Sequence, residues 1–198
     1  MPHRLGRMRL ALLLAAAPIA VVPARSLHAQ ATIIILARHG EKAAEPAANP
    51  ALSPAGVARA AALAQALSAT RLDAVLATEF TRTQETAAPA AAAHRLRVKI
   101  VPVRGDSLAH ARAVAAEIRA RRAGDAVLVV EHSNTIPAII AALGGPSLPE
   151  LCRNEYATLF VLVREPGRHP RLIRSRFGAP DPADAACDAQ GMTQGMTH

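Results

Sequence analysis

The apolar run TIIILA at residues 32–37 constrains the fold more than any other segment of the chain. It is continuous and rich in β-branched side chains, which is typical of a strand that is covered on both faces. Further strands are predicted, and most of them alternate with helical patterns; they cover residues 72–78, 97–103, 125–132, 155–165 and 170–177. Because strands that alternate with helices form mainly parallel sheets, we expect an α/β fold, a three-layer α/β/α sandwich with a mainly parallel central sheet.

Four helices are predicted between these strands, over residues 53–69, 79–94, 106–122 and 133–145. The first begins with Ser53 as N-cap and Pro54 at the first helical position. Its apolar spacing predicts a buried face that is formed by Val57, Ala60, Ala64 and Leu67. The second helix is expected to be disturbed at Pro89. The third is expected to bury Leu108, Ala111, Ala115 and Ile118.

The first 31 residues have the pattern of a secretory signal peptide. Three arginines precede an apolar stretch at residues 10–22, and small residues precede a predicted cleavage point after Ala31, with Ala29 as the alternative end. The stretch of 13 residues is too short to span a bilayer comfortably. We therefore expect a periplasmic or secreted protein without stable membrane insertion after cleavage. A retained membrane anchor is the alternative.

Charge and aromatic content argue against a nucleic-acid partner. The predicted signal peptide contains four basic residues and no acidic ones, so the mature chain keeps 19 of the 23 Lys and Arg residues against 15 Asp and Glu. The whole chain has only one Tyr, three Phe and no Trp, and no basic stripe with interleaved stacking aromatics is visible. The modest positive balance suits a small anionic ligand equally well.

Cysteine usage allows one disulfide. The chain has two cysteines, Cys152 and Cys187, and an exported protein can keep a bridge between them; two unpaired thiols are the alternative. No CxxC pair and no Cys/His spacing of a metal site is present. From Gly178 onward, residues 178–198 have little apolar content, and we expect a loosely ordered tail.

Polar side chains follow three of the predicted strands. Arg38 and His39 come directly after the first strand, Arg82 follows the second, and His132 ends the fourth. The carboxyl ends of parallel strands meet at one edge of a sheet, and ligands bind beyond that edge. Guanidinium groups match phosphoryl oxygens in bidentate geometry, and their charge disfavours protonation of a neighbouring imidazole. The pattern predicts that a phosphoryl group held there is transferred to His39 and then to water, while His132 donates to its oxygens.

The segments ARHGEK, ATEFTRTQETA, VEHSNT and NEYATLFVLV, in this order, resemble the histidine phosphatase superfamily with its phosphoglycerate mutase-like fold, and most of all its small exported bacterial members. The resemblance covers residues 32–177. It implies that His39 is the phosphoryl acceptor, that Arg38 and Arg82 bind phosphate, and that His132 is the second histidine of the pocket. It also implies catalysis without a metal or organic cofactor, on a small phosphorylated substrate, with inorganic phosphate as a further ligand.

The chain departs from the family pattern at two positions. Members usually have Gly before the second histidine, whereas this chain has Glu131. Because side chains alternate across a strand, Glu131 should point away from the face that His132 uses. The general acid is carried in members about two dozen residues after the arginine-containing helix start, where Asp106 is the only carboxylate. Asp106 also precedes a helix, and an ordinary N-cap is the alternative.

Lesser predictions concern residues close to the site. Glu41 is expected to pair with Lys42 or to order its loop, with a substrate contact as the alternative. Asn134, together with Ser133, is expected to cap the following helix, again with a substrate contact as the alternative. Three further histidines, His94, His110 and His169, are expected to be exposed and inert.

Three other functions fit parts of the pattern. A metalloenzyme with His39, Glu41 and His132 as ligands ranks low, because two arginines in the same pocket would repel a dication. A phosphate- or phosphosugar-binding protein that has lost catalysis is the main alternative, with Glu131 as the suspicious change. A phosphomutase is less favoured, since the short segments before Arg82 leave little chain for a lid. The sequence carries no prediction of the oligomeric state.

Overall fold

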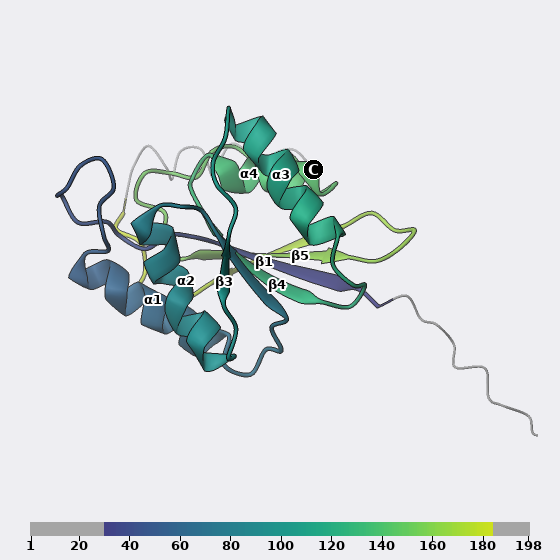
Figure 1. Ribbon diagram of the computed structural model, residues 1–198, viewed down its shortest axis with the longest axis horizontal. Helices are drawn as coiled ribbons and strands as arrows, with labels where there is room; N and C mark the ends of the chain where they lie inside the picture. Colours follow the sequence, from purple (N-terminus) through teal and green to yellow (C-terminus); the bar gives the residue numbers. More distant parts are fainter. Residues whose placement is uncertain (1–29, 184–198) are drawn as a thin grey trace, which may run out of the picture.

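A computed structural model describes residues 30–183 and shows a central sheet between two layers of helices (Figure 1). The strand order is β3-β2-β4-β1-β5-β6. The strands are β1 (Thr32–Arg38), β2 (Ala74–Ala77), β3 (Val98–Ile100), β4 (Ala126–Glu131), β5 (Thr158–Arg164) and β6 (Arg171–Arg176). The first four are parallel, whereas β5 is antiparallel to β1 and β6 is antiparallel to β5. This architecture confirms the predicted α/β sandwich with a mainly parallel sheet.

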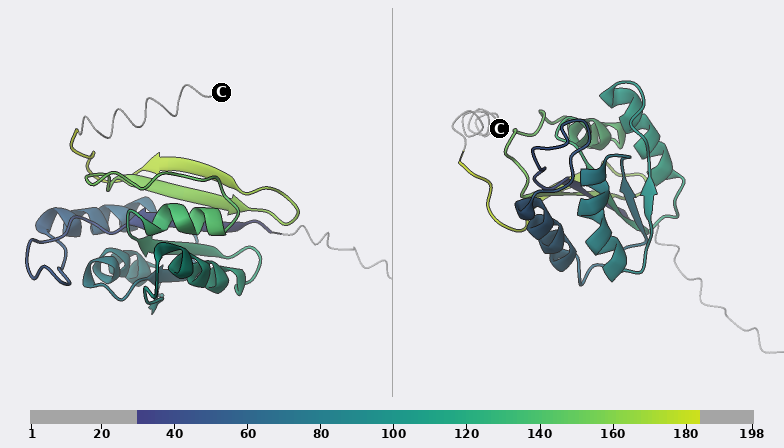
Figure 2. Two further views of the ribbon diagram at one scale, coloured as in Figure 1. Left: turned by 90° about the horizontal axis from the view of Figure 1, so that it is seen from above. Right: turned by 60° about the vertical axis from the view of Figure 1, so that its left-hand side comes forward.

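The helices cover the sheet in two pairs, one on each face, as the right-hand view of Figure 2 shows. They are α1 (Pro54–Ala66), α2 (Thr81–Ala93), α3 (Ser107–Arg119) and α4 (Thr135–Ala142). Strand β1 shows why both layers form, because its side chains alternate between the two cores. Ile34 and Leu36 join the core beneath α3 and α4, whereas Ile35 and Ala37 join the core beneath α1 and α2. The run of residues 32–37 is therefore buried on both faces, as its sequence predicts.

The helix starts agree with the sequence. Ser53 accepts a hydrogen bond from the Gly56 N–H, Pro54 is the first residue of α1, and Asp106 accepts one from the Ala109 N–H at the start of α3. Helix α2 continues through Pro89 to Ala93, so the proline does not end it.

The predicted helix faces are wrong in part. Val57 and Leu108 are 58% and 50% exposed. The buried face of α1 instead contains Arg59 and Leu63, and that of α3 contains His110 and Val114, which corrects the expectation that His110 is exposed. Alanine-rich helices have little contrast between their faces, so apolar spacing alone leaves the rotation of the helix open.

Strand register brings the polar strand ends together. Strands β1 and β4 are adjacent, with Arg38 opposite Glu131, and the His39 N–H donates to the Glu131 carbonyl over 2.9 Å. Strand β2 lies on the other side of β4, with Ala77 opposite Val130. The residues after β1, β2 and β4 therefore share one edge of the sheet. The amino end of the antiparallel strand β5 lies at the same edge, because Ala37 is paired with Leu159.

The ends of the chain are described only in part. The predicted signal peptide lies outside the described residues except for its last two positions, and no helix within residues 30–183 has the length and apolar character needed to cross a membrane. Residues 179–182 are bonded to the domain: Asp181 accepts the Tyr156 and Ala157 N–H groups. Cys152 is disulfide-bonded. Cys187 and the rest of the predicted tail lie outside the described residues, so the pairing of the two cysteines stays a prediction.

Candidate active site

His39 is buried at the end of β1 with one ring nitrogen free to react. Its side chain is 6% exposed, and Nδ1 lies 2.8 Å from the Gly40 carbonyl oxygen. A carbonyl only accepts, so Nδ1 carries the proton and Nε2 carries the lone pair. Burial, with smaller contributions from the charges of Arg38 and Arg82, lowers the pKa of His39 to about 4. His39 is therefore neutral near pH 7, as predicted, and burial lowers its pKa more than the two arginines do.

The glycine after His39 allows the strand end to pack closely against α1. A Cβ atom on Gly40 would lie 2.8 Å from the Gly56 carbonyl oxygen and 2.9 Å from its Cα, both of them backbone atoms that cannot rotate away. The Gly40 N–H donates to Thr86 Oγ1 of α2 over 2.9 Å. Thr86 in turn donates to the Arg82 carbonyl. The loop that carries His39 is therefore fixed to both helices of its layer.

Arg38 is anchored on one side of its guanidinium group. Nη1 donates to three backbone carbonyls of the segment before β5, at 2.8 to 3.0 Å; they belong to Cys152, Arg153 and Glu155. The guanidinium carbon lies 4.1 Å from the centre of the Tyr156 ring. Nε is buried and has no hydrogen-bond partner among the described residues. This arrangement holds the planar fork rigidly while one donor stays available to an anion.

Arg82 faces the same place from the start of α2. Its guanidinium carbon lies 4.5 Å from the centre of the Phe80 ring, and its Nε is likewise buried without a hydrogen-bond partner within residues 30–183. Burial lowers the pKa of Arg82, and the charge of Arg38 lowers it further. Arg38 and Arg82 are partly desolvated and repel each other, so an anion bound between them would stabilise both.

His132 completes the cluster. Its ring centre lies 5.3 Å from that of His39, with the two planes at 64°. Its pKa is lowered to about 3, chiefly by burial and then by the neighbouring His39 and Arg82. Both histidines are therefore neutral near pH 7. The structure brings the predicted residues of three strand ends together, as the sequence predicts.

A chain of hydroxyl groups fixes the tautomer of His132. Thr83 donates to the Phe80 carbonyl over 2.7 Å, so its oxygen accepts from Thr78, 2.8 Å away. Thr78 has then used its only proton and accepts from His132 Nε2, at 3.2 Å. In neutral His132 the lone pair is therefore on Nδ1. A bound dianion would favour the protonated ring, whose Nδ1 can donate.

Sequence reasoning missed several supporting residues. Tyr156 packs on Arg38, and its ring centre lies 6.2 Å from that of His39. Arg59 is 4% exposed, and its Nε and Nη2 contact the Glu41 carboxylate at 2.6 to 3.0 Å. The expected pairing of Glu41 with Lys42 is therefore wrong, although Glu41 does order the loop. Tyr156 had a visible signal, as the only tyrosine of the chain within the NEYATLFVLV segment.

The remaining predicted residues have structural contacts. Glu131 points into the core on the α3 and α4 side, away from the site, as strand alternation predicts. Asn134 precedes α4 but makes no capping hydrogen bond with its side chain; Thr135 supplies a hydroxyl there instead. Asp106 is exposed and caps α3. The acid role of Asp106 and the substrate contacts of Asn134 and Glu41 stay predictions.

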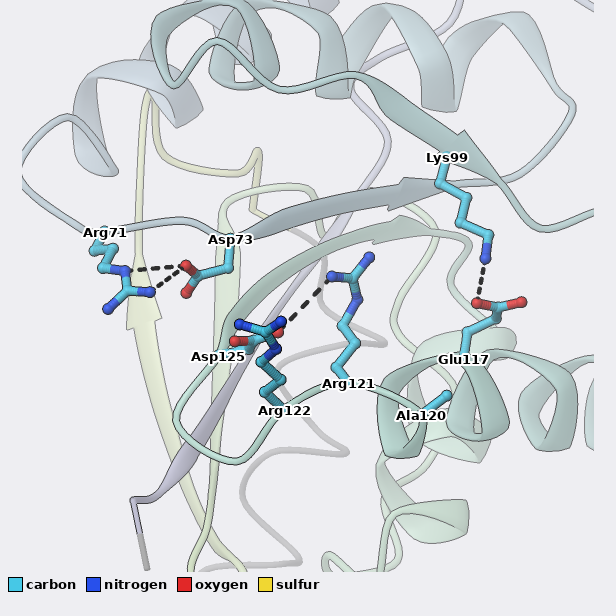
Figure 3. A pocket seen from close by; sticks show the side chains of 8 residues that line it. All are labelled: Arg71, Asp73, Lys99, Glu117, Ala120, Arg121, Arg122 and Asp125. Carbon is cyan, nitrogen blue, oxygen red and sulfur yellow. Dashed lines mark hydrogen bonds and ion pairs between the residues drawn. The ribbon is translucent and has the colours of Figure 1, made fainter.

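A second hollow lies at the opposite edge of the sheet, before β2 and β4, and has a volume of about 500 Å³. Besides Arg122, Figure 3 shows three charged pairs in its lining: Arg71 with Asp73, Arg121 with Asp125, and Lys99 with Glu117. These cations already have carboxylate partners, unlike the arginines beside His39. Within residues 30–183, no group of three or more His, Cys, Asp or Glu side chains is arranged to hold a metal ion.

The carboxyl edge of this α/β sheet therefore gathers two histidines, His39 and His132, and two arginines, Arg38 and Arg82, into one candidate anion site. The family model for the histidine phosphatase superfamily (branch 1) matches residues 34–103, which include Arg38, His39 and Arg82. No curated protein sequence matches the chain.

Solved structures share the fold over nearly their whole length. A mycobacterial glucosyl-3-phosphoglycerate phosphatase is 19% identical with a TM-score of 0.59, over 76% of this chain and 100% of that one. A protein histidine phosphatase SixA complexed with tungstate is 16% identical with a TM-score of 0.58, over 73% and 96%. A candidate phosphohistidine phosphatase SixA from Agrobacterium tumefaciens is 25% identical with a TM-score of 0.53, over 75% and 98%. These structures show that the chain shares their fold, and the family model shows a likeness in sequence to the histidine phosphatase superfamily over residues 34–103.

Proposed function

We propose that this protein is an exported phosphomonoester hydrolase that works through a phosphohistidine intermediate on His39 and needs no metal ion. The single observation that carries the proposal is the state of His39. Its Nδ1 donates to a backbone carbonyl, its Nε2 holds a lone pair, and its pKa of about 4 keeps it neutral at physiological pH. A neutral imidazole beside two arginines with free buried donors is suited to attack a phosphoryl group.

The reaction has two steps. Arg38 and Arg82 bind the non-bridging oxygens of the phosphomonoester, and His39 Nε2 attacks phosphorus as the bond to the leaving oxygen breaks. The leaving oxygen takes a proton from a general acid, for which Asp106 is the candidate. Water then attacks phosphorus and gives a proton back to the general acid, the phosphorus–nitrogen bond breaks, and phosphate is released with His39 restored. His132, protonated when the dianion is bound, donates from Nδ1 to a non-bridging oxygen in both steps.

The neighbours with known ligands agree with this proposal. One acts on glucosyl-3-phosphoglycerate and another is a protein histidine phosphatase that binds tungstate, a tetrahedral oxyanion like phosphate. A site that binds such anions needs hydrogen-bond donors that are held in fixed positions. We extend the phosphatase reaction to this chain, and leave the leaving group open to sugars, nucleotides, lipid headgroups or phosphoproteins. Export to the periplasm or medium rests on the predicted signal peptide.

The binding-protein alternative loses its main argument. It rested on Glu131 displacing His132, but the Glu131 side chain lies in the opposite core and His132 keeps its ring beside His39. The loop between β1 and α1 is fixed to the domain, because Glu41 pairs with Arg59 and Asn49 is hydrogen-bonded to Thr81, so it is poorly suited to be the lid that a phosphomutase needs. Hydrolysis is therefore the better assignment.

The test is turnover of p-nitrophenyl phosphate by the purified mature protein, with and without a metal chelator. We expect release of p-nitrophenol at the same rate in both, and none above background from His39→Ala at equal folded concentration. Phosphate binding without turnover in the wild-type protein would support the binding-protein alternative. Loss of activity with the chelator, restored by a divalent cation, would contradict metal independence.

A further inference from the structure

Glu131 forms a buried pair that the proposed reaction does not use. Its Oε1 lies 3.0 Å from Nε2 of His110 in α3, and the two side chains are 1% and 0% exposed. Burying an isolated carboxylate is costly, whereas a carboxylate with a cation and hydrogen bonds is tolerated. Glu131 stands where related proteins usually have glycine, so His110 supplies the partner that this substitution requires.

The pair is connected to His132 through one hydroxyl group. Thr135 Oγ1 donates to Glu131 Oε2 over 2.8 Å, and the His132 N–H donates to Thr135 Oγ1 over 3.0 Å. A hydroxyl has a single proton. Because Glu131 takes that proton, a lone pair of Thr135 is directed at the backbone of His132. The His132 carbonyl oxygen is a second acceptor for this hydroxyl, but it lies 3.3 Å away, so the closer Glu131 carboxylate takes the proton.

The charge of His110 is consistent with this arrangement. Burial lowers its pKa, but the hydrogen bond and the charge of Glu131 outweigh burial, and the net pKa is raised. The Pro102 carbonyl and the charge of Glu79 also raise the pKa of His110. Nδ1 of His110 is buried and has no hydrogen-bond partner among the described residues. His110 therefore carries a proton more readily than an ordinary histidine. The charge of the buried Glu131 carboxylate is therefore balanced by His110, which is in direct contact with it.

We propose that Glu131 is a positioning residue for His132, acting through Thr135, with His110 as its charge partner. His132 is then held by its ring on Thr78, by its backbone N–H on Thr135, and by its carbonyl, which accepts from the Ile136 N–H. Loss of the Thr135 hydroxyl lets the ring of His132 shift relative to His39 and to the phosphoryl group. The kinetic consequence rests on the proposed phosphatase function, whereas the structural consequence does not.

The test uses Thr135→Val, which keeps the shape of the side chain and removes the hydroxyl, and Glu131→Gln, which removes the charge. We expect each to lower kcat for p-nitrophenyl phosphate about 10-fold with little change in KM, since one buried hydrogen bond is lost. The double variant should be no slower than either single variant, because both break the same series of hydrogen bonds. Thr135→Ser should restore the rate. Glu117→Gln, which removes an exposed carboxylate of α3, is the matched control and should behave as the wild type.

A second measurement does not depend on turnover. The backbone amide of His132 should exchange its proton with solvent faster in Thr135→Val and Glu131→Gln than in the wild type, by about 10-fold, and its NMR signal should shift. Unchanged exchange with wild-type kcat would overturn the proposal, as would additive losses in the double variant. If Glu131→Gln does not fold, Thr135→Val decides alone. If the wild-type protein shows no turnover at all, the phosphatase assignment fails, and amide exchange still decides whether Glu131 positions His132.

Discussion

Acidification should destabilise this protein through His39 before most carboxylates titrate. The pKa of His39 is about 4 in the native state and 6.5 in an unfolded chain. Between these values the unfolded chain binds a proton that the native state does not bind, so stability is complete above pH 6.5 and is lost as the pH falls toward 4. A difference of one pKa unit is worth about 1.4 kcal/mol. From pH 6.5 to 4.5, His39 alone should cost about 2 kcal/mol.

The window from pH 6.5 to 4.5 isolates the two histidines of the site. His132 acts in the same direction as His39, because its native pKa is about 3. His110 has a raised pKa and acts in the opposite direction: its contribution to stability is complete below pH 6.5 and is lost only at higher pH, so it changes little within this window. Glu41 has a lowered pKa, so its contribution is lost only at lower pH.

The assay is urea unfolding at pH 6.5 and 4.5 for the wild type and His39→Asn. The wild type should lose about 2 kcal/mol more than the variant across this interval, in the free energy of unfolding. His169→Gln removes an exposed histidine and serves as the control, with wild-type behaviour expected. Equal losses in wild type and His39→Asn would refute the conclusion that His39 is held neutral by its surroundings.

Two further substitutions test the cations of the site. Arg82→Ala should lower kcat for a phosphomonoester by about 100-fold or more, as the loss of an oxyanion donor does; an unchanged kcat with only a raised KM would contradict its role in the transition state. Arg59→Met should destabilise the fold by about 2 kcal/mol, measured by urea unfolding, because it leaves Glu41 without its partner. A change below about 0.5 kcal/mol, the range of ordinary surface substitutions, would show that the pair is not needed to hold the loop.

Most of the fold could be predicted because the strands carry strong signals. The runs at residues 32–37 and 126–130 are apolar and rich in β-branched side chains, and the structure places β1 and β4 there as neighbours in the middle of the sheet. Helix rotation could not be predicted as well. Val57 and Leu108 are exposed although their spacing suggested burial, because alanine covers several faces of each helix and tertiary packing decides which one faces the sheet.

The sequence predicted the site residues that directly follow parallel strands. It did not predict the contacts that the segment before β5 and helix α3 supply. Arg38, His39 and His132 sit directly at strand ends, so topology alone brings them together. The carbonyls that hold Arg38 come from the segment before β5, whose antiparallel direction the sequence did not indicate. His110 has no local pattern that separates it from a surface histidine, and only the packing of α3 against β4 reveals its contact with Glu131.

The central claim is that phosphorus becomes bonded to His39 during turnover. The direct measurement is to mix the protein with a ³²P-labelled phosphomonoester, stop the reaction in alkaline denaturant, in which phosphohistidine survives, and map the label by peptide. We expect the label on the peptide that contains His39, and none in His39→Asn. Turnover that leaves the label on another residue, or on no residue when phosphoryl transfer is faster than hydrolysis, would contradict the account.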